Sequence, residues 1–155
     1  MPTKSRNVYV YNKTKETFLA FRVKVADGVL SRLVGLLGKR TLKPDTGAWI
    51  VPSNSIHTIG MLFTIDAVFI DKNFKVVGVR EMLHPFSITR PNFRAESVIE
   101  LPAHTIFKSR TEVGDQLQIE RYEPEEMKIA ASPREFLPPS PRAPRQIRTR
   151  SRVLQ

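Results

Sequence analysis

Apolar residues run almost without a break through residues 61–70, MLFTIDAVFI, and Asp66 carries the only charge in this run. A segment so rich in Phe, Ile, Val and Leu is typical of a strand that is buried on both faces. Small polar residues and His57 precede it, and the turn-like sequence Asp-Lys-Asn follows it. A buried carboxylate is costly unless it is hydrogen-bonded or paired. Asp66 therefore either braces a turn or belongs to a site.

Shorter β-rich segments lie on both sides of this central strand, separated by Gly, Pro, Asn and Asp. The first two of them predict an antiparallel hairpin. The predicted strands cover residues 7–11, 17–25, 48–51, 75–81, 97–101 and 116–122. Residues 82–92 contain two prolines and predict a long irregular connection.

One helix is predicted in residues 28–37, after the first hairpin, with Asp27 as its N-cap and Gly38 as its stop. Its apolar positions have helical spacing and are Leu30, Leu33, Val34 and Leu37. Many short strands with one early helix favour a mainly β (α+β) fold, a compact small β-barrel or sandwich-like domain.

The chain divides by composition near residue 123. Residues 1–123 are predicted to form a single mainly β domain, and residues 124–155 a Pro- and Arg-rich tail that is extended or disordered, because too few apolar residues are present to offset the entropy of ordering. The last part of this tail has five arginines and no acid, namely Arg142, Arg145, Arg148, Arg150 and Arg152. Such a segment favours non-specific binding to polyanions, including nucleic acid, although a merely solubilising tail explains it equally well.

Several functional classes are disfavoured by what the sequence lacks. The 155 residues contain no cysteine, which excludes disulfides, thiolate chemistry and cysteine-based zinc sites. The three histidines, His57, His84 and His104, have no metal-binding spacing, and Walker A, GxGxxG and GxSxG motifs are absent. No cofactor is indicated. Because no signal-peptide or membrane-length apolar segment is present, a cytoplasmic protein without a membrane partner is expected.

Three residues are candidates for chemistry. His57 is either a hydrogen-bonding tether or a functional group, and Asp66 is either a structural acceptor of backbone N–H groups or part of a site. Glu100 alternates with Ile99 and Leu101, so it points either to the same side as Asp66 or to solvent. On the same side, the two carboxylates could form a pair for acid–base work or for a divalent cation.

Two functions follow from these candidates. The first is a non-enzymatic binding module, in which the His57 loop, with Ser55 and Thr58 as contacts, and the Asp66 strand line a pocket for a small polar ligand or a peptide. The second is a hydrolase or isomerase that uses His57 as general base and Asp66 as its orienting acid. A hydrogen bond between His57 and Asp66 in an open pocket would favour the enzyme. A buried Asp66 that is bonded only to backbone would disfavour it.

The sequence also resembles the prokaryotic family called domain of unknown function 192, over residues 8–122. The matching pieces are RLVGLLGKRTL at 32–42, SIHTIGMLFTIDAVFIDKNFKVV at 55–77, VIELPAHTI at 98–106 and VGDQL at 113–117. The resemblance implies a small mainly β domain with a helix after the first hairpin, and it implies no established activity, cofactor or catalytic residue. Many members of the family carry Gly where this chain has His104, and the basic tail lies outside the family's pattern.

Overall fold

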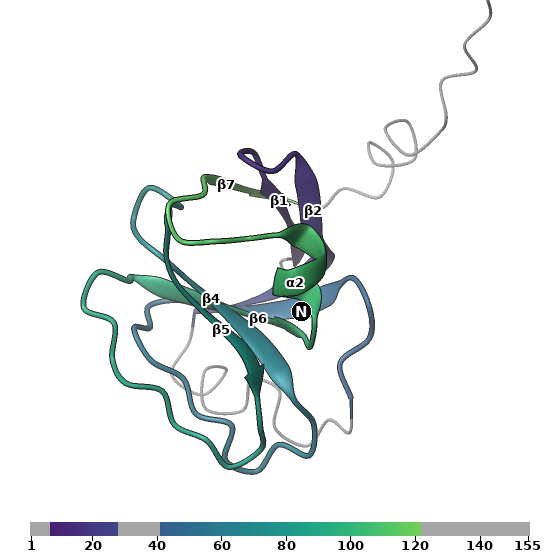
Figure 1. Cartoon of the computed structure of the whole chain (residues 1–155), viewed down its shortest axis with the longest axis vertical. Helices are drawn as coiled ribbons and strands as arrows, with labels where there is room; N and C mark the ends of the chain where they lie inside the picture. The colour runs from purple at the N-terminus through teal and green to yellow at the C-terminus, as the bar shows by residue number, and fades with distance from the viewer. Residues whose placement is uncertain (1–6, 28–40, 122–155) are drawn as a thin grey trace, which may run out of the picture. The chain divides into compact units, whose positions relative to one another are not determined.

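The computed structural model describes residues 7–27 and 41–121, which form one curled sheet of seven strands and a short helix (Figure 1). The mainly β fold predicted from the sequence is confirmed. The predicted helix in residues 28–37 and the tail in residues 124–155 lie outside the described residues. The elements are β1 (Asn7–Asn12), β2 (Thr17–Ala26), β3 (Thr46–Ile50), β4 (Ile65–Ile70), β5 (Val76–Leu83), β6 (Ser97–Pro102), α2 (Thr105–Ser109) and β7 (Leu117–Arg121).

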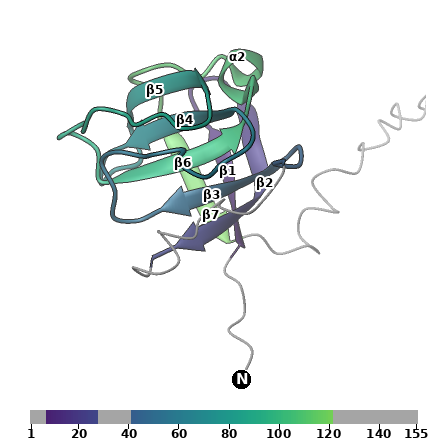
Figure 2. The same cartoon turned by 90° about the horizontal axis from the view of Figure 1, so that it is seen from below.

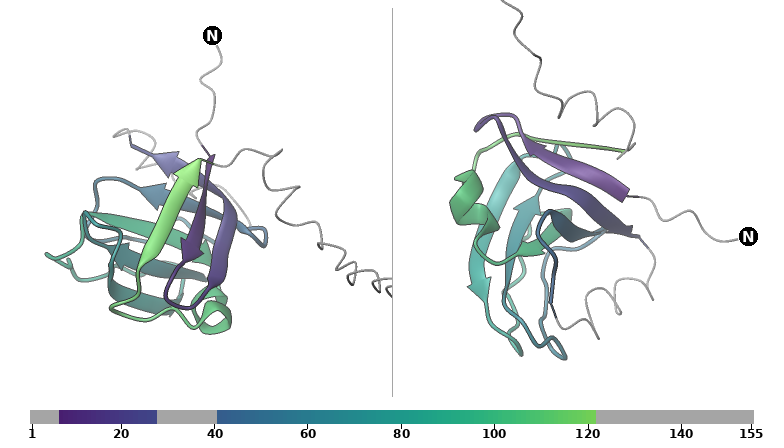
Figure 3. Two further views of the ribbon diagram at one scale, coloured as in Figure 1. Left: turned by 90° about the horizontal axis from the view of Figure 1, so that it is seen from above. Right: turned by 90° about the vertical axis from the view of Figure 1, so that its right-hand side faces the viewer.

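The strands follow the order β5-β4-β6-β3-β2-β1-β7 across the sheet. All neighbours pair antiparallel except β2 and β3, which are parallel. The sheet curls so far that β1, β2 and β7 run across the direction of β4, β5 and β6 (Figures 2 and 3). At one end the two edge strands meet, because Val76 N–H donates to the Asp115 carbonyl and Leu117 N–H donates to the Phe74 carbonyl, each at 2.9 Å. The result is a half-barrel.

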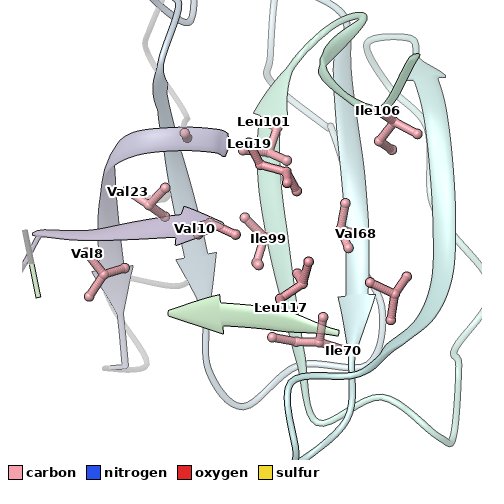
Figure 4. Close-up of a cluster of buried hydrophobic side chains, with 12 residues drawn as sticks. Val8, Val10, Leu19, Val23, Val68, Ile70, Ile99, Leu101, Ile106 and Leu117 are labelled. Atoms are coloured by element: carbon pink, nitrogen blue, oxygen red, sulfur yellow. The ribbon is translucent and has the colours of Figure 1, made fainter. Parts of the chain in front are cut away.

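The inside of the half-barrel is filled by aliphatic side chains from six strands and α2, here called the inner cluster (Figure 4). Its fully buried members include Val10, Val68, Ile70, Ile99 and Leu101. Burial of side chains of this size contributes roughly 1.5–3 kcal/mol each. The inner cluster therefore holds the strongly curled sheet in its shape.

A second apolar layer, here called the outer cluster, covers the opposite face of the central strands. Ala48, Ala67, Phe69 and Val98 supply the sheet side of this layer, and the two long connections that follow β3 and β5 supply its cover. The side chains of the cover are Ile56, Met61, Phe63 and Ala95. Because both faces are covered, all six residues of β4 are buried, as the apolar run predicted.

Two local features differ from the prediction. The central strand begins at Ile65 and not at Met61, because residues 51–64 form a loop of the cover. The helix α2 was not predicted from the sequence. It follows His104, which has the left-handed conformation with φ 70° and ψ 4°. Glycine adopts this conformation without strain, whereas a residue with a Cβ does not.

Candidate functional site

The two long connections pair with each other and form a small two-stranded structure at one end of the sheet, here called the loop ribbon, residues 55–59 and 86–90 (Figure 1). His57 and Ile88 are antiparallel partners in it. On either side of them Thr58 N–H donates to the Ser87 carbonyl at 2.8 Å, and Thr89 N–H donates to the Ile56 carbonyl at 2.9 Å. Residues that are about thirty positions apart in sequence therefore share one local surface.

The inward face of the loop ribbon is buried and its hydrogen bonds are internal. The Thr58 hydroxyl donates to the His84 carbonyl at 2.7 Å and accepts the Ser87 N–H at 2.8 Å. The Thr89 hydroxyl accepts the Ile56 N–H at 2.9 Å. Thr58, expected as a ligand contact, is buried, and its hydroxyl is occupied in holding the two connections together.

The outward face of the loop ribbon is largely exposed, and half of its side chains are apolar. Alternation along the two chains places Ser55, His57 and Ile59 beside Phe86, Ile88 and Arg90. The exposed fractions are 47% for Ile59, 68% for Phe86 and 72% for Ile88, and Leu62, just after the turn at Gly60, is 68% exposed. These apolar side chains are exposed close together, whereas the inward side chains of the same ribbon are buried.

Asp66 is buried on the inner face of the sheet, because its cross-strand partner Leu101 belongs to the inner cluster. One carboxylate oxygen accepts the Met82 N–H at 3.0 Å and the other accepts the Ile106 N–H at 2.9 Å. Asp66 thereby ties the end of β5 and the first turn of α2 to the middle of the sheet. His57 is an exposed residue of the loop ribbon and makes no hydrogen bond to this carboxylate. This arrangement supports the structural alternative for Asp66 and disfavours the hydrolase or isomerase.

Glu100 lies on the other face of the sheet from Asp66. Its direct partners are Ala48 on β3 and Ala67 on β4, and both alanines belong to the outer cluster. The proposed carboxylate pair of Asp66 and Glu100 is therefore wrong, since the sheet separates the two side chains. Glu100 is 6% exposed, and burial raises its pKa to about 7. No charged group in the described part of the chain is among the causes of this shift of the pKa.

A third buried polar group, which the sequence did not indicate as a unit, joins the β1–β2 turn to the segment before β7. The Asn12 side-chain amide donates to Asp115 at 2.8 Å and to Thr111 at 3.1 Å, while its carbonyl oxygen accepts the N–H groups of Thr14 and Lys15. The carboxylate of Asp115 also accepts the Glu112 N–H at 3.0 Å. Every member has a partner, so this network is a structural tie.

The remaining candidates give no metal or pocket site. Within residues 7–27 and 41–121, no three His, Asp or Glu side chains come together as metal ligands. A shallow depression near the start of the first connection is lined by Pro52, Ser53, Asn54, Ala95 and Glu96, and neither His57 nor Asp66 reaches it. No helix in the described part of the chain has the length and apolar character that a membrane crossing requires. The arginines of the tail lie outside the described residues.

The described residues thus form a small β domain. Its features are a curled half-barrel sheet, a buried carboxylate on each face of the sheet, and a loop ribbon with exposed apolar side chains. The DUF192 family, described as Uncharacterized ACR, matches residues 10–119. The chain belongs to this family.

The comparisons with individual proteins agree with this assignment. A UPF0127 protein of Pyrococcus horikoshii is 34% identical over 115 residues, which cover 70% of this chain and 96% of the relative. A crystal structure from Sinorhizobium meliloti, described as a candidate transcription regulator, has a TM-score of 0.64 at 20% identity and covers 77% of this chain and 96% of that one. A protein of unknown function from Novosphingobium aromaticivorans also has a TM-score of 0.64, at 15% identity, covering 76% and 89%. At these identities the two structures establish the fold alone.

Proposed function

We propose that this domain is a non-enzymatic binding module whose outward ribbon face takes an extended peptide segment of a partner protein. The observation that carries the proposal is the alternation in the loop ribbon. Its inward residues are buried and hydrogen-bonded, while its outward residues include Ile59, Phe86 and Ile88. A ribbon that faced only water would carry polar side chains at these positions.

The shape and charge of this face indicate what it would bind. Side chains that stand out from two paired chains offer a row of apolar contacts to a peptide, in contrast to the concave, enclosed site that a small ligand needs. Its titratable side chains are His57, which lies opposite Ile88 in the middle of the ribbon, and Arg90, which lies opposite Ser55 at one end. A peptide with two or three large apolar residues and a flanking Asp or Glu would match both the apolar side chains and the arginine at one end of the ribbon.

Peptide selection tests the proposal. A random-peptide library is selected on the full-length protein, and the affinity of the best peptide is measured by fluorescence anisotropy. Ile88→Ser should weaken binding by about tenfold or more, because a large apolar side chain contributes roughly 1.5–3 kcal/mol when it is buried at a contact. The matched control is Phe107→Ser on α2, whose side chain is 74% exposed and lies outside the loop ribbon.

The proposal is confirmed if Ile88→Ser weakens binding and Phe107→Ser does not. It is wrong if the selected peptides bind the Ile88→Ser variant as tightly as they bind the wild type, or if no peptide is selected. A third measurement, co-sedimentation with anionic phospholipid vesicles, separates a membrane surface from a peptide. Binding to vesicles that is lost in Ile88→Ser, without any peptide binding, would replace the peptide by a lipid surface.

A further inference from the structure

The second connection forms one edge of the loop ribbon, and its backbone points outward there. His57 and Ile88 are flanked on both sides by hydrogen bonds between the two connections, so they form a non-hydrogen-bonded antiparallel pair. In such a pair the N–H and C=O of each residue point away from the other chain. The N–H and C=O of Ile88 therefore point to the outer side of the ribbon, and those of Arg90, two residues further on, have the same orientation.

These four backbone groups are accessible to a partner. Among residues 7–27 and 41–121, none forms a hydrogen bond with the backbone N–H or C=O of Ile88 or Arg90. Ile88 is 72% exposed, and Arg90 is exposed as well. Solvent therefore reaches this edge. An edge with outward N–H and C=O groups is a template on which another extended chain can pair.

The opposite edge of the loop ribbon, formed by the first connection, is less suited to a partner strand. Its Ser55 carbonyl already accepts a hydrogen bond from the Ser53 hydroxyl at 2.6 Å. Its apolar residue Ile59 is 47% exposed, whereas Phe86 and Ile88 on the second connection are 68% and 72% exposed. The edge of the second connection thus combines outward backbone groups with the two most exposed apolar side chains of the ribbon.

We propose that the peptide binds by adding to this edge as a short antiparallel β-strand, with backbone hydrogen bonds to Ile88 and Arg90. The inference rests on the peptide-binding function proposed above and specifies how the peptide is held. Pro85 and Pro91 bracket the segment and have no N–H to donate, so the pairing is confined to residues 86–90. In this mode of recognition the backbone bonds supply affinity and alternate side chains supply specificity.

The pairing determines which side chains of the peptide contact the ribbon. The peptide residue opposite Ile88 stands beside it on the outward face. The residue two positions earlier in the peptide lies opposite Arg90, where a carboxylate would pair with the guanidinium group. The residue two positions later lies next to Phe86. Selected peptides should therefore share the pattern acidic-x-apolar-x-apolar, in which each x points to the other side of the strand.

Amide hydrogen exchange tests the backbone pairing. It is measured by nuclear magnetic resonance on the full-length, ¹⁵N-labelled protein, with and without a saturating amount of the tightest peptide from the random-peptide library. Exchange at the amides of Ile88 and Arg90 should slow by at least about tenfold, because their N–H groups become hydrogen-bonded to the peptide. The amides of His57 and Ile59, on the opposite edge, are the internal control and should exchange at an unchanged rate.

Methylation of the peptide backbone tests the same pairing from the other side. Each residue of the selected peptide is replaced in turn by its N-methyl form, and the affinity is measured by fluorescence anisotropy. In a strand only every second N–H faces the neighbouring chain. Methylation at these positions removes a donor and should weaken binding by about tenfold or more, whereas methylation at the positions between them should have little effect.

The outcomes separate this inference from the function on which it rests. Slower exchange at Ile88 and Arg90, together with an alternating methylation pattern, confirms strand addition. If Ile88→Ser weakens binding but the peptide leaves these two amides unprotected, the peptide lies across the outward face, and strand addition is wrong while peptide binding stands. Slower exchange at His57 and Ile59 instead would overturn the choice of edge. If no peptide is selected, both proposals are wrong.

Discussion

Replacing Glu100 by Gln should stabilise this protein at neutral pH and flatten the dependence of its stability on pH. Burial raises the pKa of Glu100 to about 7 from an ordinary value of 4.5. Between these two values the folded protein holds a proton that the unfolded chain has released. The free energy of unfolding therefore falls as the pH rises from about 4.5 to about 7, and it levels off above pH 7.

The size of this effect follows from the difference between the two pKa values. One pKa unit corresponds to about 1.4 kcal/mol, so ionised Glu100 lowers the free energy of unfolding by roughly 3 kcal/mol above pH 7. Glutamine has nearly the same shape and carries no charge, so the variant avoids this loss. Below about pH 4.5 both side chains are neutral, and the wild type and Glu100→Gln should be about equally stable.

Urea unfolding at a series of pH values between 4 and 8 measures this directly, with circular dichroism as the signal. The difference in free energy between Glu100→Gln and the wild type should grow from near zero to roughly 3 kcal/mol across this window. Glu96→Gln, whose side chain is exposed, serves as the control and should follow the wild type. A wild-type profile that Glu100→Gln leaves unchanged would refute the reasoning, because it would mean that Glu100 ionises freely in the folded state.

Two further predictions concern the hydrogen bonds of Asp66 and the left-handed backbone conformation of His104. Asp66→Asn should lower the free energy of unfolding by about 1–3 kcal/mol, because the side-chain NH₂ of asparagine would face the backbone N–H of Met82 or Ile106 in place of an accepting oxygen. A variant as stable as the wild type in urea unfolding would refute the structural role of Asp66. His104→Gly should raise the melting temperature, since relieving a left-handed non-glycine residue is worth about 1 kcal/mol. Ala103→Gly, at a neighbouring position without a positive φ, should lower it.

The sequence predicted the parts of this fold that depend on local pattern. The unbroken apolar run identified β4 as a strand buried on both faces, and the hairpin of β1 and β2 followed from alternation around a turn. The sequence also indicated that Asp66 is either an acceptor of backbone N–H groups or part of a site. A carboxylate in a fully buried strand needs donors, and the structure supplies them from the backbone of β5 and α2.

The parts that failed depend on contacts between distant segments. Whether Glu100 shares a face with Asp66 is decided by the register between β4 and β6, which pairs Asp66 with Leu101 and Glu100 with Ala67. One residue of shift would have reversed the answer. The loop ribbon could not be predicted either, because residues 82–92 contain two prolines and no strand pattern. Only their pairing with residues 55–59 decides which of their side chains point outward. Helix α2 spans 5 residues, too few to show a helical period.

The two buried carboxylates of this domain have opposite effects on stability. Asp66 accepts two backbone N–H groups, so its charge is compensated and the fold needs it. Burial raises the pKa of Glu100 to about 7, so its ionised form lowers the free energy of unfolding at neutral pH. Substitution by the neutral amide should therefore stabilise the protein at position 100 and destabilise it at position 66.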